Sequence, residues 1–440
     1  MSGAVLGSFR VVLWVCCALG WALLGSSPAG AASESEAPLV PLAADRARAL
    51  APLLRGSDLV LVESQPSGSL KQITLLTLVA ARPETVREVV FRAERYPDFI
   101  RQLKGSQISR SDDGSLEHAF QIDLGILRFE ARNRIAELPA SPDPARSGAE
   151  SADSSEPRDL GSDVRPLELV DPEPSPGGRR RLRLDFYAAG GGTVLAVCAY
   201  SSLASSPEPV HRLLATSPLF QHGIVAASAL SFALLIKRQA EVLTGSSGVV
   251  LPASGPADYD PLLLRGPVAL LRSRDGRLRD ISVVLRSSAS REGLLDAARQ
   301  AARWPETMPI LASSQELIGT EEQPMVDLRF SLPLLVFQSR YAVHTLGYGV
   351  DLLAVAGELL GSRLRFDIQA ATGASEADSA PASRLILRGQ HSFDRASQRL
   401  RQLYRSEPLW EYGVNFSLYF ILAQGVRRLA EGSAVTGSAR

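Results

Sequence analysis

An internal repeat constrains this chain more than any other feature of its sequence. Residues 95–99, Arg-Tyr-Pro-Asp-Phe, recur 208 positions later as residues 303–307, Arg-Trp-Pro-Glu-Thr. The same register holds without a gap over more than sixty residues and aligns residues 124–132 with 332–340. One stretch of sequence therefore occurs twice in this chain.

A second register, with an offset of 190, covers the later part of each copy. It aligns residues 218–223 with 408–413, and Lys237 with Arg427. The repeated unit is about 170 to 190 residues long, which is too long for a solenoid repeat and is the size of a domain. The repeat predicts a tandem duplication of one domain.

Composition excludes some classes of function. The chain has 440 residues, of which 45% are hydrophobic, and 47 basic residues balance 47 acidic ones. Such a length is typical of two or three domains, each able to bury its own core. Because no strong positive field follows from this balance, nucleic acid is not an expected partner.

The N-terminus has the pattern of an export signal over residues 1–31. Arg10 precedes an apolar run at 11–24, and the small residues 29–31 form a cleavage site. The run is too short for a comfortable bilayer span, so cleavage is favoured over an uncleaved anchor and the protein is expected to be periplasmic or secreted. Cys198 is then the only cysteine left, which excludes an internal disulfide, and its apolar surroundings indicate a small buried side chain.

The order of predicted elements is the same in both copies. In the first, a strand hairpin at 59–80 precedes a helix that begins at Pro83 and ends at Tyr96-Pro97, because the residue before a proline disfavours helical backbone. A short helix at 98–103 follows, and Ser290 is the expected N-cap in the second copy. Alternation at Phe120 and its neighbours indicates a half-buried antiparallel sheet. Further strands are expected at 106–111, 116–124, 127–138, 181–188 and 193–203, and long helical regions at 209–243 and 394–431 close the two copies.

Domain boundaries follow from composition. Residues 32–55 are expected to be a linker with a short helix, residues 56–244 the first domain and residues 266–432 the second. Residues rich in Ser, Pro, Asp, Glu and Gly at 139–178 predict a disordered insertion in the first domain. The remaining segments are a linker at 245–265 and a tail at 433–440.

The unit resembles the START-like helix-grip (SRPBCC) superfamily, in its polyketide cyclase/dehydrase and coenzyme Q-binding branch. The resemblance rests on the apolar strand before residues 83–86, on residues 95–99 with their copy at 301–306, and on the element order. It implies an α+β fold of two tandem domains, each a curved antiparallel sheet around a long C-terminal helix. A cavity between sheet and helix would hold a hydrophobic ligand.

We therefore expect an exported protein that binds a lipid, quinone or polyketide-like molecule without catalytic chemistry, cofactor or metal. Arg132 and Arg340 match between the copies and could hold a polar head group, although a surface position is the alternative. The remaining expected ligand contacts are Phe129, Phe220, Ile224, Ala227 and Leu234 in the first domain, and Phe337, Trp410, Val414, Tyr419 and Phe420 in the second.

Two other functions stay open. A cyclase or aromatase-type enzyme would need an acid or base in the pocket, such as His222 or its repeat equivalent Tyr412. A protein-interaction module would have filled cores. The closing helices are apolar on nearly all sides at 223–236 and 414–423, whereas a helix that covers one sheet needs one apolar stripe. Their outer faces are expected to bury each other, to contact a membrane surface or to line a wide cavity, with burial inside one domain as the alternative.

Overall fold

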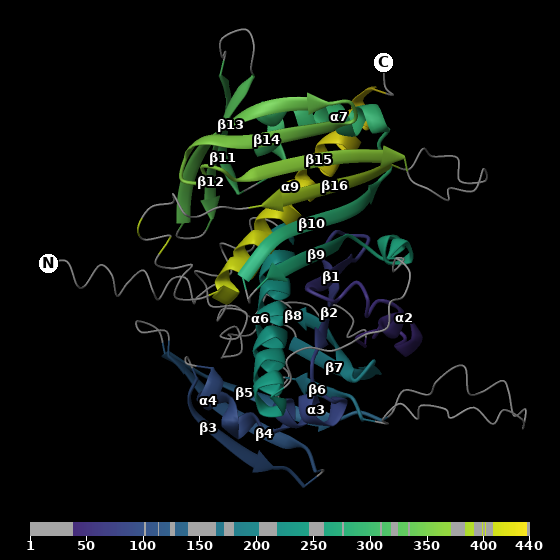
Figure 1. Ribbon diagram of the computed structural model, residues 1–440, viewed down its shortest axis with the longest axis vertical. Coiled ribbons are helices and arrows are strands. Elements are labelled where there is room, and N and C mark those ends of the chain that lie inside the picture. Colours follow the sequence, from purple (N-terminus) through teal and green to yellow (C-terminus); the bar gives the residue numbers. More distant parts are fainter. Residues whose placement is uncertain are drawn as a thin grey trace, which may run out of the picture.

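The computed structural model describes most of the chain from residue 38 onward. The core of this described part is one antiparallel sheet of sixteen strands with helices packed on it, an α+β architecture (Figure 1). The described residues are 38–100, 103–112, 114–123, 128–139, 164–170, 180–201, 218–245, 259–274, 277–308, 310–317, 324–332, 335–370, 383–390, 398, 401 and 408–437. The predicted signal segment lies outside them.

The two copies of the repeat form two units with eight described strands each. The first unit contains β1 (Ser57–Ser64), β2 (Leu70–Val79), β3 (Leu103–Arg110), β4 (Leu116–Asp123), β5 (Arg128–Glu137), β6 (Leu167–Val170), β7 (Arg180–Ala189) and β8 (Gly192–Ser201). The second contains β9 (Val268–Arg274), β10 (Arg277–Ser287), β11 (Leu311–Leu317), β12 (Met325–Leu332), β13 (Leu335–Leu346), β14 (Gly349–Gly357), β15 (Arg363–Ala370) and β16 (Ser383–Gln390).

The described helices also correspond between the units. Each unit has a short helix that packs beside the sheet, a turn of helix at the repeated motif, and a long closing helix. They are α2 (Ala44–Ala49), α3 (Pro83–Phe91), η1 (Ala93–Arg95), α4 (Tyr96–Phe99) and α6 (Pro218–Thr244), followed by η3 (Asp260–Leu264), α7 (Arg291–Arg299), η4 (Ala301–Glu306) and α9 (Pro408–Gly437).

The strand order shows the duplication directly. From the centre outward it is β1-β2-β8-β7-β6-β5-β4-β3 on one side and β9-β10-β16-β15-β14-β13-β12-β11 on the other. The units join where β1 pairs antiparallel with β9, from Ser57 opposite Arg272 to Leu61 opposite Val268. Gly266 lies at this junction, where a Cβ atom would overlap the carbonyl oxygen of Val62. Two edge strands that would otherwise be exposed are thereby paired.

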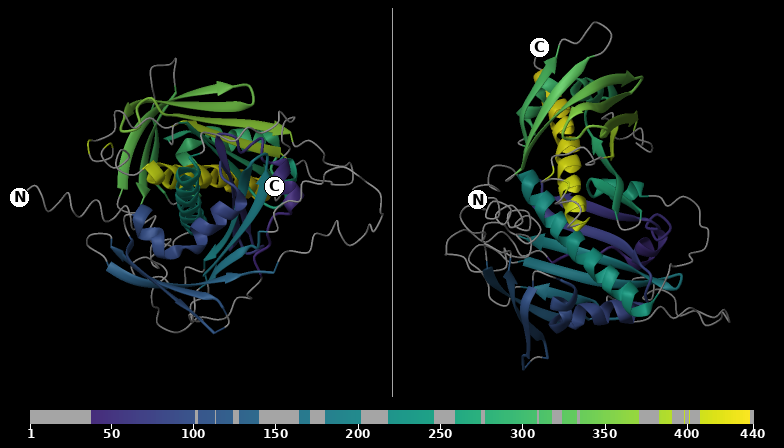
Figure 2. Two further views of the ribbon diagram at one scale, coloured as in Figure 1. Left: turned by 60° about the horizontal axis from the view of Figure 1, so that its bottom comes forward. Right: turned by 60° about the vertical axis from the view of Figure 1, so that its left-hand side comes forward.

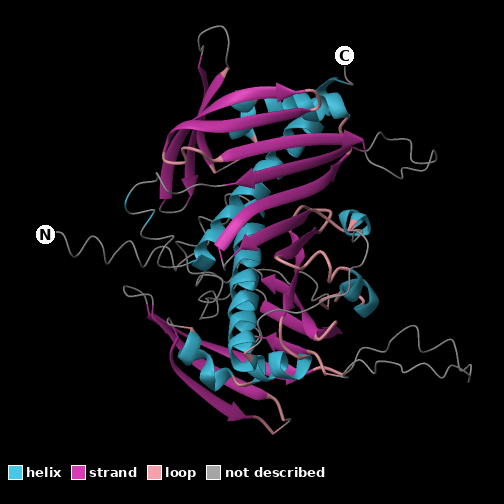
Figure 3. Cartoon of the chain, viewed as in Figure 1, coloured by secondary structure: helices cyan, strands magenta, loops and turns pink. Residues whose placement is uncertain are grey.

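The central strands are buried on both faces. On the outer face, Leu59, Leu76 and Val194 belong to an apolar cluster that α2 and η3 cover, through Leu50 and Leu262 among others. Figure 3 shows these two short helices on the side of the sheet opposite to the long helices. The predicted linker at 32–55 is thus corrected: its described part belongs to the core, because the apolar outer face of β1, β2 and β8 needs a cover.

The closing helices α6 and α9 lie on the inner face and pack against each other. At their contact, a Cβ atom added to Gly223 would lie 2.7 Å from Ser417 Oγ, and the ring centroids of His222 and Phe420 are 6.0 Å apart. Two further views show the helices meeting near the middle of the molecule (Figure 2). Apolar side chains around both helices are therefore buried by the sheet on one side and by the partner helix on the other.

The repeated motif has a different local structure from the one predicted. Helix α3 buries Val86, Val89 and Val90 as expected, but it ends at Phe91. Tyr96 has helical backbone angles and begins α4, with a proline in the first turn. The steric effect of a following proline is a preference that the tertiary context overrides here. Ser290 is confirmed as an N-cap, since its side chain accepts a hydrogen bond from the Gly293 N–H.

The predicted disordered insertion also needs a correction. Strand β6, at Leu167–Val170, lies inside it and pairs with β5 and β7. Leu167 and Leu169 face the core, so a short alternating pattern is sufficient for a strand when two neighbours supply hydrogen bonds. Its counterpart β14 in the second unit is nine residues long.

Candidate ligand-binding site

The space between the sheet and the closing helix of the second unit is lined by large apolar side chains. Side chains alternate along β13, so Phe337 and Tyr341 point inward, and the Phe337 ring stacks on Phe330 with centroids 4.9 Å apart. Tyr419 and Phe420, on α9, are fully buried in the same apolar cluster, and the Phe420 ring also lies beside His222 of α6. Three of the predicted ligand contacts, Phe337, Tyr419 and Phe420, thus belong to one interior.

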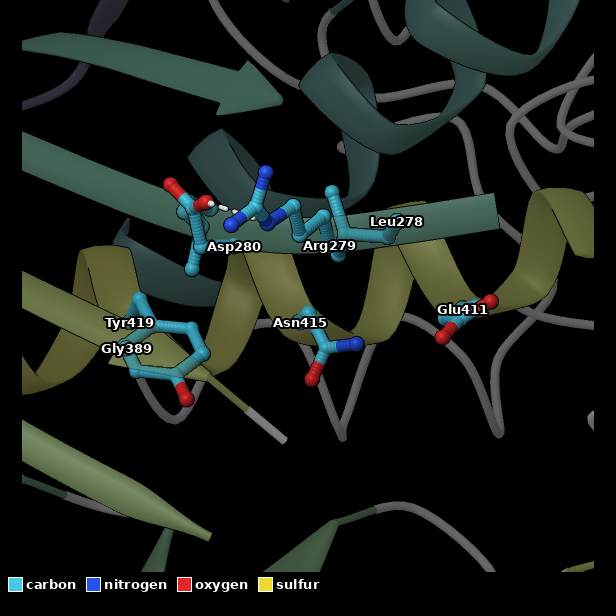
Figure 4. Close-up of a pocket in the computed structure, with 8 residues that line it drawn as sticks. Leu278, Arg279, Asp280, Gly389, Glu411, Asn415 and Tyr419 are labelled. Atoms are coloured by element: carbon cyan, nitrogen blue, oxygen red, sulfur yellow. Dashed lines mark ion pairs between the residues drawn. The ribbon is translucent and has the colours of Figure 1, made fainter. Parts of the chain in front are cut away.

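A pocket lies where α9 crosses β10 and β16 (Figure 4). Its volume is about 10 Å³, which is room for about one water molecule. Gly389 forms part of the wall because the Tyr419 ring occupies the position that its Cβ atom would take. The lining residues are Leu278, Arg279, Asp280, Ile281, Gly389, Glu411, Asn415 and Tyr419.

Polar groups on one face of α9 point toward this pocket. Glu411, Asn415 and Tyr419 are four residues apart, so they lie above one another on the helix. Asn415 is 1% exposed, and its Oδ1 has no hydrogen-bond partner. A buried acceptor without a donor costs about 1–3 kcal/mol. This group is therefore a candidate contact for a bound polar atom.

The Glu411 carboxyl group is held in an unusual environment. Burial raises its pKa, while Arg277 and a hydrogen bond with the Leu278 backbone lower it, and burial has the larger effect. Arg277 Nε lies 3.2 Å from Glu411 Oε2, but that oxygen has no partner with hydrogen-bond geometry. Glu411 thus retains the capacity to accept a hydrogen bond at the end of the pocket.

The first unit does not repeat this polar arrangement. At the 190-residue offset, Asn415 corresponds to Val225 and Tyr419 to Ala229. Gln221, the equivalent of Glu411, donates its side-chain N–H to the Ser201 carbonyl oxygen at 2.9 Å. Val225 and Ala229 are buried apolar residues. The two interiors therefore differ in polarity although their strands correspond.

The structure describes the side chains of only some of the other predicted ligand contacts. Ala227 is buried, and Leu234 is half-buried against the core. In the second unit, Val414 is also half-buried. Four other predicted contacts lie in the described backbone, but their side chains are outside the described set: Phe129 on β5, Phe220 and Ile224 on α6, and Trp410 on α9.

Arg132 and Arg340 do not face the interior, so their prediction as ligand contacts is corrected. Both are exposed. Arg340 alternates with the inward residues of β13 and forms an ion pair with Asp327, with Nε 2.8 Å from Oδ1. Arg132 lies opposite Ala119, out of phase with the inward Phe120. The period of two along a strand places these side chains on the outer face.

The proposed acid or base residues have different surroundings: His222 lies at the contact between α6 and α9, and Tyr412 lies against β9 beside the pocket residue Glu411. His222 is buried, neither ring nitrogen has a hydrogen-bond partner, and burial together with Arg428 lowers its pKa to about 4. Burial raises the pKa of Tyr412 to about 12, although a hydrogen bond with Ser273 lowers it. Neither residue is among those that line the pocket.

A second buried histidine lies in the first unit. His118 Nε2 is 2.8 Å from Ser106 Oγ, and its ring packs against Tyr96 and Phe120. Nδ1 has no partner, and burial lowers the pKa of the ring to about 4. Its equivalent in the second copy is Val326, so this group is specific to the first unit.

The repeated motif is structural in both units. Tyr96 Oη donates to the Val90 carbonyl oxygen at 2.7 Å, and Trp304 Nε1 donates to the Ala297 carbonyl oxygen at 3.0 Å. Both rings are buried, and exposed ion pairs of the motif's arginine with its acidic residue close each turn. In each unit, the buried aromatic residue of the motif links the motif's helical turn to the preceding helix, α3 or α7, by a hydrogen bond.

Within the described part of the chain, no group of three or more His, Cys, Asp or Glu side chains could hold a metal ion. One helix of that part, Gln221–Thr244, is long and apolar enough to cross a membrane by length and composition. It is α6, and 65% of its most apolar window is buried, as expected for the core helix of a globular protein.

No protein-family model and no curated protein matches the chain. Among solved structures, it is similar to the di-domain ARO/CYC StfQ from the steffimycin biosynthetic pathway, at 13% identity and a TM-score of 0.30, over 83% of this chain and 99% of that one. The di-domain ARO/CYC BexL from the BE-7585A pathway has 11% identity and a TM-score of 0.27, over 82% and 98%. A START superfamily protein from Mycobacterium smegmatis has 12% identity and a TM-score of 0.27, over 35% and 96%.

These similar structures belong to the group that the residue pattern indicated, namely START-like proteins and aromatase/cyclases. At such identities and TM-scores, the likeness bears on no ligand, activity or residue role. Glu411 and Asn415 were not among the predicted contacts, although the change from Val225 to Asn415 between the aligned copies was a signal for them in the sequence.

Proposed function

We propose that this protein binds a hydrophobic small molecule, such as a lipid, quinone or polyketide-like compound, in tandem START-like helix-grip units and without catalysing a reaction. One observation carries the proposal: buried polar atoms without hydrogen-bond partners lie within an apolar interior, at Asn415 Oδ1 and Glu411 Oε2 beside the pocket and at Tyr341 Oη on β13, with Arg277 as an ion-pair partner of Glu411. Native interiors rarely leave such groups unsatisfied. A bound molecule with its own donors would satisfy them.

The chemistry of the interior indicates an amphiphile. The walls supply apolar area, which gives affinity without direction, and the few polar groups on α9 would orient one end of the molecule. Asn415 Oδ1 and Glu411 Oε2 accept hydrogen bonds, so a hydroxyl, amine or phenol group suits them. A ligand of ordinary size needs several hundred Å³, so binding requires α9 to move away from β10 and β16.

Export is part of the proposal. The pattern of residues 1–31 supports a signal segment, and a binder of apolar molecules in a periplasmic or extracellular setting would carry them through water. The N-terminal sequence of the protein recovered outside the cytoplasm tests this part. Recovery only of uncleaved protein in the membrane fraction contradicts it.

Two other functions have support from particular observations. The raised pKa of Glu411 is what a general acid needs, which favours a cyclase-type enzyme. The small volume of the described pocket favours an interaction module with filled cores. Loss of turnover on a polyketide substrate in Glu411→Gln, with ligand retention unchanged, would support the enzyme.

Native mass spectrometry of the purified protein, followed by solvent extraction, tests ligand binding. We expect an apolar molecule to accompany the wild type and to be lost from Asn415→Val, which copies the residue of the first unit. Gln424→Leu is the matched control, because Gln424 is a buried polar residue of α9 that does not line the pocket. Repeated absence of any apolar molecule, together with failure to bind added lipid, contradicts the proposal.

A further inference from the structure

The outer face of the second unit is rich in arginine. Along β12 to β16, the described residues that alternate with the core positions include six arginines and three aspartates. The arginines are Arg329, Arg340, Arg363, Arg365, Arg384 and Arg388, and the aspartates are Asp327, Asp351 and Asp367. We call this surface the arginine face. It is positive although the chain as a whole is neutral.

Three of the described arginines on the arginine face lie farther out than their acidic partners, whereas Arg384 is 15% exposed and pairs with the more exposed Asp260 of η3. The Arg340, Arg363 and Arg388 side chains are 45–52% exposed, whereas their partners Asp327 and Asp351, and Asp367 beside Arg388, are 9–17% exposed. The carboxylates therefore lie beneath the guanidinium groups. A molecule that approaches this face meets positive charge first.

Aliphatic side chains are exposed among the arginines. Leu353 and Val355 on β14 are each 40% exposed, Leu346 on β13 is 43% exposed and Val336 is 52% exposed. Leu353 lies directly opposite Arg363 of the neighbouring strand. Exposed aliphatic groups within a positive surface suit a partner that is anionic and also has an apolar layer beneath its charges.

The two copies of the repeat differ at these positions. In the first unit, the positions of Arg384 and Arg388 are occupied by Val194 and Cys198, which are buried beneath the segment that includes α2. In the second unit, both pair with β10 in the corresponding register, and Arg388 is exposed. The first unit thus covers this part of its outer face, whereas the second presents the charge of Arg388 there and pairs the less exposed Arg384 with Asp260 of η3.

We propose that the arginine face docks the protein on an anionic lipid bilayer. Guanidinium groups would contact lipid phosphates, to which their planar donors are suited, while Leu353 and Val355 reach the level of the acyl chains. The charge pattern and the exposed aliphatics favour a bilayer over an acidic protein. The arginine face is a different surface from that of the closing helices α6 and α9, which pack against each other. Membrane docking by this face does not require a ligand in the interior.

Co-sedimentation with vesicles tests the proposal. We expect the full-length protein to bind phosphatidylcholine vesicles that contain about 30% phosphatidylglycerol, to bind pure phosphatidylcholine poorly, and to be released by salt. The triple variant R329Q/R340Q/R388Q should weaken partitioning by more than about tenfold, since each basic residue near such a surface contributes about fivefold.

The matched control is the triple variant K104Q/R132Q/R134Q. It removes the same charge from described, outward positions of the first unit, and it should bind as the wild type does. Thermal unfolding checks that both triple variants are folded. The double variant Leu353→Ser, Val355→Ser tests how much the exposed aliphatic side chains contribute to vesicle binding, because it leaves the charge unchanged. Equal binding by the two triples, or no binding of the wild type to anionic vesicles, overturns the proposal.

Discussion

Replacing Gly389 by alanine tests the packing that forms the pocket wall. The new methyl group would overlap Cε1 and Cζ of the Tyr419 ring. Because Gly389 lies within β16 and the ring is fully buried, neither group can move freely. Overpacking of this kind costs about 1–3 kcal/mol, so Gly389→Ala should lower the free energy of unfolding by at least that amount.

A double-mutant cycle separates this clash from other effects of the substitution. Tyr419→Ala alone should cost about 3–5 kcal/mol, as expected for loss of a buried aromatic ring. With the ring removed, Gly389→Ala should be nearly neutral, since the first unit has alanine at both equivalent positions, Ala199 and Ala229. The expected coupling energy is therefore about 1–3 kcal/mol.

Urea unfolding followed by circular dichroism measures the four free energies of this cycle. Ala199→Gly in the first unit is the control for the intrinsic effect of glycine in a strand, and it should show no dependence on Tyr419. The reasoning about the pocket wall is refuted if Gly389→Ala costs the same amount with and without the Tyr419 ring.

Three other substitutions have expected outcomes. The pKa of His222 falls from 6.5 to about 4 on burial, so the unfolded chain binds the proton more tightly. Stability that is present above pH 6.5 should be lost toward pH 4, by up to about 3 kcal/mol, and His222→Leu should flatten this dependence of the urea midpoint on pH; an unchanged slope contradicts the assignment. Tyr96→Phe removes the hydrogen bond to Val90 and should cost about 1–2 kcal/mol, and a cost near zero in thermal unfolding would show that this bond is dispensable. Gly223→Leu should clash with Ser417 and destabilise the contact between α6 and α9, which faster hydrogen exchange in both helices would report and exchange changes confined to α6 would contradict.

Much of the fold could be predicted because its signals are local. The period of two in β4 and β7 and the helical spacing of Val86, Val89 and Val90 are properties of neighbouring residues, and the structure has these elements close to the expected positions. The predictions were wrong where contacts with other parts of the chain outweighed a local backbone preference. Tyr96 entered a helix despite the following proline, and β6 formed because β5 and β7 lie on either side of it.

The candidate site was predictable only in part. Phe337, Tyr419 and Phe420 were expected from apolar spacing, and burial is what apolar spacing reports. Asn415 was not predicted as a ligand contact because it lies in a helix that is otherwise apolar. Its place beside the pocket depends on the strands β10 and β16 that face it. Whether Arg340 points inward or outward depends on which alternate residues of β13 face the core. The match between Arg132 and Arg340 in the two copies does not reveal which residues these are.

The sequence by itself determined that this protein is a duplicated unit, because a register sustained over many residues requires no knowledge of contacts. It also predicted most of the strands and helices along each unit, although not β6. Only the tertiary structure decided that β1 pairs with β9, that the closing helices cover each other, and that arginines form the outer face of one unit. These contacts join residues far apart in the chain, so the free energy that selects them depends on which surfaces remain exposed after local structure has formed.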